Sequence, residues 1–374
     1  MKIGINATSL NDRPSGAKNR FIGIYKSVFK KMHMHNFVIY QSQDCDMKSW
    51  FEGIENISFI TVPCKSTSRF SRFLAHFTFW EAELISKQFD LLESLHQPII
   101  KNNYSLGATV STIYDVRGSK EGNFIKRLIY RFLIQSTLRN SDLIITISNT
   151  IKSEILSLKK HENIKVVGCG IKDKIASIDE ESKIFRLFFE KDFILSVGHL
   201  EDRKNYHLMV KAFSELIKDL PNKHLVIVGN DNGGKKSLEK LIKSLQLTDK
   251  VTMLENITDK ELGTIYHLSK GVIFPSLYEG FGIPILETMI YQKPLILSNI
   301  NVFHEITESH AVFFNPYNIN EINKCMKMIF TQPNRFLEYI EYGKKRAQDF
   351  SFEKLAANTS SIFESYDLKK PLKQ

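Results

Sequence analysis

The stretch from 274 to 287 reads Phe274-Pro275-Ser276-Leu277-Tyr278-Glu279-Gly280-Phe281-Gly282-Ile283-Pro284-Ile285-Leu286-Glu287. The short apolar run that leads into it, from Gly271 to Phe274, is typical of a buried parallel strand, and Pro284 suits the first turn of a helix. A helix start offers backbone amides and the positive end of the helix dipole to an anion, and Gly280 and Gly282 allow a ligand close to the backbone. The stretch therefore predicts a strand, a loop and a helix around a diphosphate.

Two glutamates, Glu279 and Glu287, stand on either side of this loop and helix start. An ionised glutamate only accepts hydrogen bonds, so near a phosphate site it suits a ligand with several donors, such as a sugar diol. We therefore interpret the stretch as the floor of a sugar-nucleotide site. The alternative is that both glutamates are solvated helix charges.

Short apolar runs alternate with longer amphipathic ones along all 374 residues, which is the pattern of parallel α/β sheets. A chain of this length has room for about two domains. We expect an N-terminal domain over 1–172, a polar linker over 173–192, a second domain over 193–350, and a last helix over 352–366 that packs back on the first domain. The predicted strands are 2–7, 37–40, 57–62, 90–95, 108–113, 142–147, 164–167, 193–197, 224–228, 251–254, 272–274, 294–297 and 311–314.

The charge is uneven, because +8 of the net +10 lies in residues 1–180. A basic half attracts anions, and phospholipid head groups, an acidic acceptor and nucleic acid are all compatible with it. The four cysteines are scattered without metal-site spacing, which favours reduced thiols over zinc. No apolar run reaches the roughly 18 residues of a membrane span, and the start at Met1 reads as a strand rather than a signal peptide. We expect a cytoplasmic protein with an optional peripheral place on the inner face of the cytoplasmic membrane.

A second motif, Val197-Gly198-His199-Leu200-Glu201-Asp202-Arg203-Lys204-Asn205, follows the first strand of the second half. Arg203 offers a planar fork and Lys204 a point charge, and charge-assisted hydrogen bonds of this kind bind phosphate. The alternative is an ordinary basic helix start, although cations there oppose the helix dipole.

With these motifs the chain resembles the retaining glycosyltransferases of family GT4, from about residue 2 to 352. Glu279 and Glu287 match the E-x7-E signature of that family, and residues 198–205 are similar to its G-T-L-E-P-R-K-N segment. The resemblance implies the GT-B fold, an α/β fold of two facing Rossmann-like domains with parallel sheets and a deep interdomain cleft.

The resemblance also implies roles for individual residues in donor binding and catalysis. Arg203 and Lys204 would hold the donor diphosphate, Glu287 the ribose hydroxyls, and Glu279 would face the transferred sugar. The remaining donor contacts that it implies are Gly280, Phe281 and Gly282 through main-chain amides, Ile257 beside the base, and Gly16 in the loop after the first strand. Glu255 stands where the family usually has a glycine, which leaves the base contact open.

On the acceptor side, the resemblance points to Tyr114 and Asp115, where relatives often read Ile-His-Asp-Leu. Tyr114 replaces the histidine, and with a usual pKa near ~10 it can donate a hydrogen bond but cannot relay protons at neutral pH. Asp115 keeps the carboxylate of the motif, with helix capping as the alternative.

Other features invite a functional interpretation that their context does not favour. Asp44-Cys45-Asp46 looks like a D-x-D metal motif but has no second carboxylate cluster, and residues 229–234 form a glycine-rich loop without the ending of a P-loop. His96 and His199 each end a strand, where structural roles are commoner. Residues 65–80 combine three cations with five aromatics, which is typical either of an interfacial helix or of one that packs on the sheet.

We therefore predict a metal-independent retaining hexosyltransferase, without a cofactor, whose partners are a nucleotide-sugar donor and a lipid-linked saccharide acceptor of polysaccharide synthesis. GDP-mannose is the favoured donor, and rhamnosyl or glucosyl transfer from dTDP- or UDP-sugars is the alternative. Another enzyme class on the same fold is a sugar-nucleotide epimerase. A basic nucleic-acid-binding protein is the rival from a different class. It predicts aromatic residues interleaved with cations in both halves of the chain, whereas the positive charge is concentrated in the first half.

Overall fold

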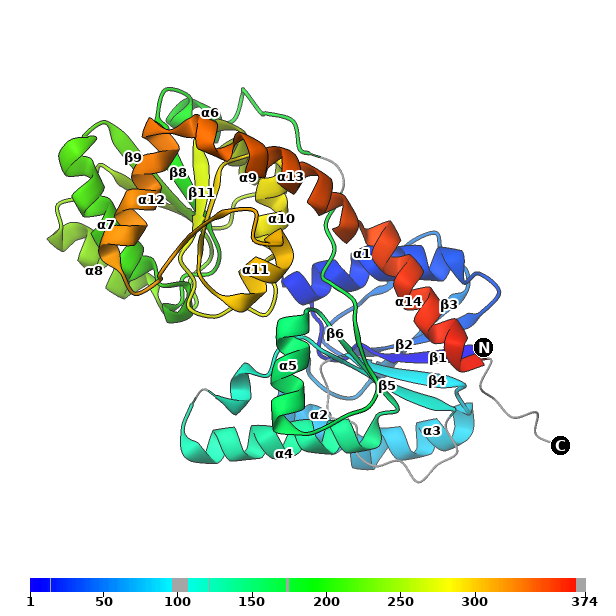
Figure 1. Cartoon of the computed structure of the whole chain (residues 1–374). Coiled ribbons are helices and arrows are strands. Elements are labelled where there is room, and N and C mark those ends of the chain that lie inside the picture. Colours follow the sequence, from blue (N-terminus) through cyan, green and yellow to red (C-terminus); the bar gives the residue numbers. More distant parts are fainter. Residues whose placement is uncertain (14, 96–106, 121, 173–174, 368–374) are drawn as a thin grey trace. The chain divides into compact units, whose positions relative to one another are not determined.

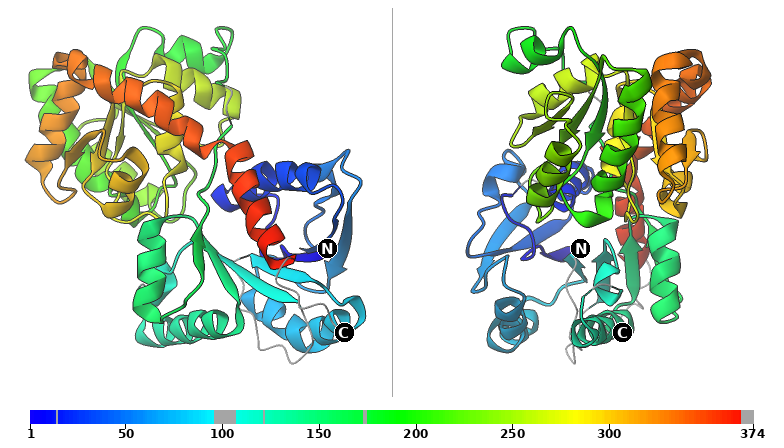
Figure 2. Two further views of the ribbon diagram at one scale, coloured as in Figure 1. Left: turned by 45° about the vertical axis from the view of Figure 1, so that its right-hand side comes forward. Right: turned by 90° about the vertical axis from the view of Figure 1, so that its left-hand side faces the viewer.

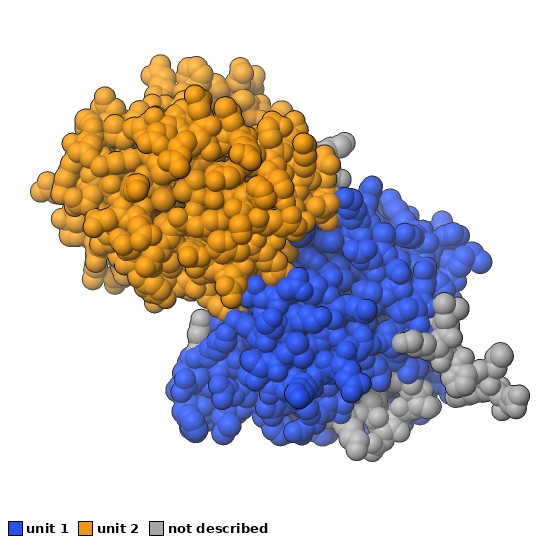
Figure 3. Space-filling model, viewed as in Figure 1, with its two compact units in different colours: residues 1–170, 350–374 blue, residues 171–349 orange. Residues whose placement is uncertain are grey.

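The computed structural model describes residues 1–13, 15–95, 107–120, 122–172 and 175–367. The chain divides into two compact units (Figures 1 and 3). Unit 1 consists of Met1–Gly170 together with Phe350–Gln374, and unit 2 consists of Ile171–Asp349. Each unit is described below by itself.

In the described part of unit 1, seven parallel strands form one sheet in the order β3-β2-β1-β4-β5-β6-β7. The strands are β1 (Lys2–Asn6), β2 (Asn36–Ser42), β3 (Ile57–Val62), β4 (Leu91–Leu95), β5 (Ala108–Ile113), β6 (Leu143–Thr146) and β7 (Ile164–Val166). The helices are α1 (Gly16–Lys31), α2 (Arg69–Ala75), η2 (His76–Trp80), α3 (Glu81–Lys87), α4 (Phe124–Asn140), α5 (Asn149–Leu158) and α14 (Phe352–Asp367), with short turns η1 (Lys48–Phe51) and η3 (Arg117–Ser119).

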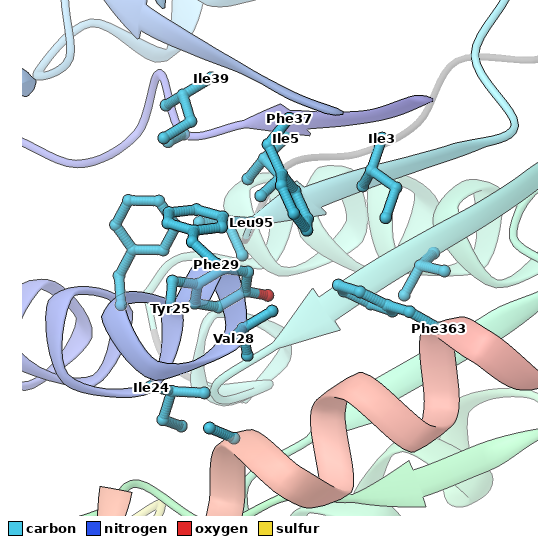
Figure 4. Close-up of a cluster of buried hydrophobic side chains, with 14 of the residues drawn as sticks. Ile3, Ile5, Ile24, Tyr25, Val28, Phe29, Phe37, Ile39, Leu95 and Phe363 are labelled. Atoms are coloured by element: carbon cyan, nitrogen blue, oxygen red, sulfur yellow. The ribbon is translucent and has the colours of Figure 1, made fainter. Parts of the chain in front are cut away.

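The main core of unit 1 lies between the sheet and helices α1 and α14 (Figure 4). Ile3 and Ile5 of β1 meet Phe29 of α1 and Phe363 of α14 there, all without exposed surface. The two helices approach closely, since a Cβ on Gly23 would lie 2.3 Å from the Phe352 ring. The last helix of the chain is therefore an integral part of unit 1.

In the described part of unit 2, six parallel strands form a sheet in the order β10-β9-β8-β11-β12-β13. They are β8 (Asp192–Val197), β9 (Lys223–Val228), β10 (Val251–Leu254), β11 (Gly271–Phe274), β12 (Leu295–Ser298) and β13 (Val312–Phe314). The helices are α6 (Lys183–Phe188), α7 (Tyr206–Asp219), α8 (Lys235–Ser244), α9 (Asp259–Leu268), α10 (Ile283–Ile290), α11 (Asn301–Thr307), α12 (Ile319–Thr331) and α13 (Leu337–Ala347), with short turns η4 (Asp202–Lys204), η5 (Pro333–Phe336) and η6 (Gln348–Phe350).

Each of the thirteen strands predicted from the sequence is present, with ends that differ by at most two residues. The segment 173–192, expected to be a linker, is different in its described part. It belongs to unit 2, and its backbone is bonded to the rest of that unit: Ala176 N donates to Tyr291 Oη (3.2 Å) and Asp179 N to Thr264 Oγ1 (3.0 Å). Ile184 and Phe188 of α6 are buried. The segment is polar on average, but these two hydrogen bonds and two buried side chains hold it against the rest of unit 2.

Among the residues that the structure describes, no helix is long and apolar enough to cross a membrane. All four cysteines are buried free thiols, as their scattered positions predicted.

Candidate functional site

The order of the strands in unit 2 indicates a candidate binding site. Strand connections lead away in opposite directions from β8 and β11, which are neighbours in the sheet but distant in sequence. In open parallel sheets, ligands bind outside the carboxyl ends of the strands at such a switch point. The loops that leave β8 and β11 carry the two motifs noted in the sequence, and they touch, since Leu277 N donates to Arg203 O (2.8 Å). The fold thus brings both motifs to one place.

Three predicted residues meet directly at this switch point. The carboxylate of Glu279 accepts from Lys204 Nζ (2.6 Å) on one oxygen and from Arg203 Nη1 (2.7 Å) on the other. Ser276 Oγ donates to Glu279 as well (2.9 Å), and the second fork nitrogen of Arg203 pairs with Glu201 (2.6 Å). The Lys204 and Glu279 side chains are only 10% exposed. The structure therefore holds two cations and two carboxylates in a balanced, nearly buried cluster, called here the switch-point cluster (Arg203, Lys204, Glu201 and Glu279).

The pKa values follow from this arrangement. Burial alone would raise the pKa of Glu279, but the Lys204 and Arg203 cations outweigh it and lower the pKa to about 2. Burial opposes the charge on Arg203, and the carboxylates of Glu279 and Glu201 outweigh that and hold its pKa above the usual value. Glu279 and Arg203 are thus both charged at neutral pH.

The lowered pKa of Glu279 predicts an acid-sensitive contribution to the stability of unit 2. Because the folded pKa is about 2 and the ordinary pKa of a glutamate is 4.5, the contribution is complete above pH 4.5 and is lost as the pH falls toward 2. Its size is about 3 kcal/mol at neutral pH. Denaturant unfolding from about pH 6 to about pH 3 should show this loss in the wild type and not in Glu279→Gln. Parallel curves for the two proteins would contradict it.

Two glycines allow the loops to come this close. Gly198 has φ +153°, and a Cβ there would lie 2.9 Å from the Lys204 ammonium nitrogen. Gly229, after β9, packs against the same loop, since its Cβ would lie 1.9 Å from Gly198 O. Larger residues at these positions would displace the Lys204 side chain or the loop that carries it.

The predicted helix start is also present. Gly282 caps α10 with φ +122° and ψ +59°, a conformation that favours glycine, and Pro284 lies in the first turn. Phe281 is buried, while Gly280 and Gly282 are half-buried. The loop and the first turn of α10 therefore lie beside the switch-point cluster.

Glu287 begins the second turn of α10, in a different environment from Glu279. Its carboxylate accepts from Tyr266 Oη of α9 (2.8 Å), and burial raises its pKa. The Tyr266 ring stacks on Tyr291, with centroids 4.8 Å apart. Glu287 is thus held in one orientation by a neighbouring helix, which suits a residue that accepts hydrogen bonds from a diol.

The region predicted to contact the base has an unexpected organisation. Ile257 is half-buried and precedes the capping box of α9, in which Thr258 and Glu261 satisfy each other's backbone amides. Glu255, in the position of the usual glycine, accepts from Lys235 Nζ and from Asp231 N (3.0 Å). Its carboxylate therefore links the loop after β10 to the loop after β9 by hydrogen bonds.

Three predicted residues lie in unit 1: Gly16, expected to contact the donor, and Tyr114 and Asp115, expected on the acceptor side. Gly16 is the exposed first residue of α1. The Tyr114 ring lies 5.6 Å from the buried Arg20 guanidinium, and burial raises the pKa of Tyr114 to about 12, so its hydroxyl stays protonated. Asp115 accepts from Arg117 N (3.0 Å), so its carboxylate stabilises the turn that leads into η3, although the N-cap position of η3 is Val116.

Several residues of these sites were missed in the sequence. Glu201 and Ser276 lie inside the two motifs. The signal that could have identified them was their closeness in sequence to Arg203 and Glu279. Tyr266 could be found only from the packing of α9 on α10. In strand β4 of unit 1, Glu93 is fully buried and accepts from Thr112 Oγ1 (2.5 Å) and Tyr25 Oη, which no sequence pattern indicated.

The remaining candidates are accounted for locally or lie elsewhere. Asp44 accepts from Ser66 N (2.8 Å) and Oγ (2.9 Å), and Asp46 accepts from Lys48 N (3.1 Å), so both carboxylates of the D-x-D-like sequence stabilise turns. His199 is exposed in the loop after β8. His96 lies outside the described residues.

Comparison with known proteins identifies a family and individual proteins that this chain resembles. The family described as "Glycosyl transferases group 1" matches residues 177–346, which contain the switch-point cluster. The chain is 28% identical over 232 residues to the O-antigen chain mannosyltransferase RfbU of Salmonella typhimurium, which covers 62% of this chain and 63% of RfbU. It is 37% identical over 134 residues to the serotype-specific mannosyltransferase WbdA of Escherichia coli, which covers 36% of this chain and 16% of WbdA.

A solved structure, sucrose-phosphate synthase from Thermosynechococcus elongatus, superimposes with a TM-score of 0.79 at 16% identity, over 99% of this chain and 100% of that one. At this identity the likeness shows the fold alone. The fold is the GT-B fold that the sequence predicted.

Proposed function

The chain belongs to the group 1 glycosyltransferases, and on that basis we propose that it transfers a hexose from a nucleoside diphosphate sugar to a hydroxyl of a lipid-linked saccharide. The observation that carries the proposal is the switch-point cluster, in which Arg203 and Lys204 are fixed by buried carboxylates beside the start of α10. Mannose from GDP-mannose is the favoured donor, because RfbU and WbdA are named as mannosyltransferases. The acceptor would belong to the synthesis of a cell-surface polysaccharide.

In this proposal the donor lies along the carboxyl ends of β8 and β11. Arg203 and Lys204 bind the diphosphate together with the first-turn amides of α10, and Glu287 accepts from the ribose hydroxyls. Ile257 lies toward the base, while Glu279 and the loop of Gly280 to Gly282 lie toward the sugar. No metal is required, since the two cations stabilise the charge that grows on the leaving diphosphate.

We propose that transfer retains the anomeric configuration by attack on the face that the diphosphate leaves. The bond from the anomeric carbon to the phosphate oxygen breaks, the acceptor oxygen bonds to that carbon, and the acceptor proton passes to the leaving phosphate oxygen. In this scheme Tyr114 and Asp115 contact the acceptor only as hydrogen-bonding groups, because a tyrosine with a pKa raised to about 12 does not take part in proton relay at neutral pH.

Thermal-shift measurements with sugar nucleotides test the donor site directly. We expect GDP-mannose and GDP to raise the melting temperature, UDP and dTDP sugars to raise it less, and the double variant Arg203→Ala, Lys204→Ala to lose the shift. If no sugar nucleotide stabilises the protein, the proposed function is contradicted. If UDP or dTDP sugars stabilise it most, the transferase remains and the mannose assignment fails.

Replacing Glu287 by alanine should weaken donor binding about 10- to 100-fold, because hydrogen bonds from a hydroxyl to a charged acceptor contribute roughly 1.5 to 3 kcal/mol. The fold should remain, since α10 keeps its apolar contacts. The matched control is Tyr266→Phe, which removes the hydrogen bond to Glu287 but keeps the carboxylate, and should cost less than about fivefold. Calorimetric titration with GDP measures both variants. Unchanged affinity in Glu287→Ala would remove this residue from the ribose role.

A further inference from the structure

Residues 175–182, called here the leading segment, lie close to the start of unit 2. The first part of unit 1 ends at Gly170 and unit 2 begins at Ile171, so the chain reaches the leading segment soon after it leaves unit 1. Most side chains of the segment are exposed, and Ala176, Asp179 and Ser182 are half-buried. With so little burial, its attachment to the rest of unit 2 depends on a few hydrogen bonds.

The backbone of Ala176 is bonded to the rest of unit 2 through both its amide and its carbonyl. The N–H donates to Tyr291 Oη (3.2 Å), and the carbonyl oxygen accepts from His267 Nε2 (3.0 Å). Gly263 of α9 makes room for this contact, because a Cβ there would lie 2.7 Å from Ala176 Cβ and 2.7 Å from Tyr291 Oη. Ala176 is therefore in direct contact with α9 and with the tyrosine that ends α10.

From Tyr291 the contacts continue to Glu287. Helices α9 and α10 lie side by side in unit 2 (Figures 1 and 2), and the ring of Tyr291 stacks on that of Tyr266 with planes 8° apart. Tyr266 is only 1% exposed, and its hydroxyl donates to the Glu287 carboxylate (2.8 Å). The four residues Ala176, Tyr291, Tyr266 and Glu287 thus form one continuous series of contacts, called here the tyrosine path.

Two further observations place the leading segment and its surroundings close to Glu287. Asp179 N donates to Thr264 Oγ1 (3.0 Å), and Thr264 lies in α9 two residues before Tyr266. Burial raises the pKa of Glu287, while the hydrogen bond from Tyr266 and the positive charge of Lys172 act in the opposite direction. The start of unit 2 therefore acts on Glu287 through charge as well as through contacts.

We propose that Tyr291 is a positioning residue that couples attachment of the leading segment to nucleotide binding at Glu287. A ribose diol that donates to Glu287 fixes the carboxylate, which holds Tyr266 in place and, through the stack, Tyr291 against Ala176. The coupling is reciprocal, so attachment of the segment strengthens nucleotide binding by the same factor. The inference rests on the proposed function, which supplies the ribose at Glu287.

The choice of ligand separates this role from simple packing of unit 2. A packing role acts on the stability of the whole unit and would affect every ligand of that unit alike. The tyrosine path ends at the carboxylate proposed for the ribose, so it responds only to ligands that have a ribose. The expected factor is about threefold, the size of one neutral hydrogen bond, and it stays below the loss of less than about fivefold expected for Tyr266→Phe.

The first test measures amide hydrogen exchange of the unmodified protein with saturating GDP or saturating pyrophosphate. We expect GDP to slow exchange of the Ala176 and Asp179 amides about threefold, and pyrophosphate, which offers the same cations a diphosphate without a ribose, to slow it less than about 1.5-fold. Equal slowing by both ligands would mean that unit 2 stiffens as a whole and would overturn the proposal. Unchanged exchange with bound GDP would overturn it as well.

The second test is Tyr291→Phe, which keeps the ring stack and removes the acceptor of the Ala176 amide. Calorimetric titration should show GDP affinity lowered about threefold and pyrophosphate affinity unchanged. The matched control is Tyr342→Phe, since Tyr342 also stacks on a ring, that of His310 (3.6 Å), and bonds Glu308 through its hydroxyl. GDP affinity of the control should stay within about 1.5-fold of the wild type. Equal GDP affinity in the two variants would overturn the proposal.

The third test asks whether Tyr291 acts through Tyr266. Tyr266→Phe removes the hydrogen bond to Glu287 and so interrupts the tyrosine path at its other end. In this variant GDP should still bind but should no longer slow exchange of the Ala176 amide. Adding Tyr291→Phe to Tyr266→Phe should lower GDP affinity no further, because residues of one path are not additive. A further loss of about threefold in the double variant would show that Tyr291 acts independently of Tyr266 and would overturn the proposal.

Failure of the coupling and failure of the proposed function give different results. If GDP binds and Glu287→Ala weakens it, but exchange at Ala176 and the GDP affinity of Tyr291→Phe both match the unliganded and wild-type values, the donor site stands and the coupling is overturned. If a different nucleoside diphosphate binds most tightly, the same measurements apply with it, because the ribose is shared. If no nucleoside diphosphate binds, the proposed function is contradicted and the coupling falls with it.

Discussion

Glu279→Gln should lower the free energy of unfolding of unit 2 by about 3 kcal/mol at neutral pH. The carboxylate pairs with Lys204 (2.6 Å) and Arg203 (2.7 Å) in a nearly buried site, and its loss leaves an excess positive charge there. Breaking one partner of a buried ion pair is strongly destabilising for this reason. Denaturant unfolding at neutral pH, followed by a probe in unit 2, measures the change.

The same variant should respond more strongly to a diphosphate. In the wild type Glu201 and Glu279 already balance Arg203 and Lys204, whereas in Glu279→Gln an anionic ligand supplies the missing charge. GDP or pyrophosphate should therefore raise the melting temperature of Glu279→Gln by more than that of the wild type. A smaller shift in the variant would contradict a diphosphate site at these cations.

A matched control for the stability effect lies at the opposite end of the same sheet. Asp192 pairs with Lys223 (2.6 Å) and Lys270 (3.2 Å) but is 44% exposed. Exposed ion pairs contribute less than about 1 kcal/mol, so Asp192→Asn should have a small effect and no altered response to GDP. Equal destabilisation by both variants would show that burial of the switch-point cluster is not the cause.

Lys204→Met should lower turnover about 100- to 1000-fold while weakening donor binding less than about tenfold. The negative charge on the diphosphate increases as the sugar leaves, so a fixed cation stabilises the transition state more than the bound donor. Methionine keeps most of the apolar stem of the side chain and removes the ammonium. Steady-state kinetics together with GDP-mannose titration separate the two effects.

The control for this second variant is Lys223→Met, which removes a lysine that is paired with Asp192 far from the switch point. Its turnover should stay within about twofold of the wild type. If Lys204→Met lost donor binding and turnover by the same factor, the lysine would serve ground-state binding only.

The strands were predictable because each leaves a clear pattern. A parallel strand covered on both faces is a short apolar run, as in Gly271–Phe274, and thirteen such runs became thirteen strands. The start of α10 was predictable for a similar reason, since Gly282 and Pro284 have strong local preferences. These are properties of neighbouring residues, which a single sequence contains.

Pairings across the fold could not be predicted in the same way. Arg203 was expected to bind the diphosphate of the donor and Glu279 to face its sugar. Their direct pairing was not predicted, because only the adjacency of β8 and β11 brings them together. The bond from Tyr266 to Glu287 depends on the packing of α9 against α10. Which side of residues 65–80 faces water depends on the sheet beneath it, so the sequence alone left two interpretations.

The return of the chain to unit 1 has a consequence for its synthesis. Unit 2 is one continuous segment, Ile171–Asp349, while unit 1 needs α14, which supplies Leu355, Ala356 and Phe363 to its core. At usual rates the ribosome takes roughly 10 to 40 s to translate the residues between Gly170 and Phe350. During that time the first 170 residues have an open core, so the part of the protein that is made first is the last to be completed, and a nascent chain that stalls before α14 is a natural client for chaperones.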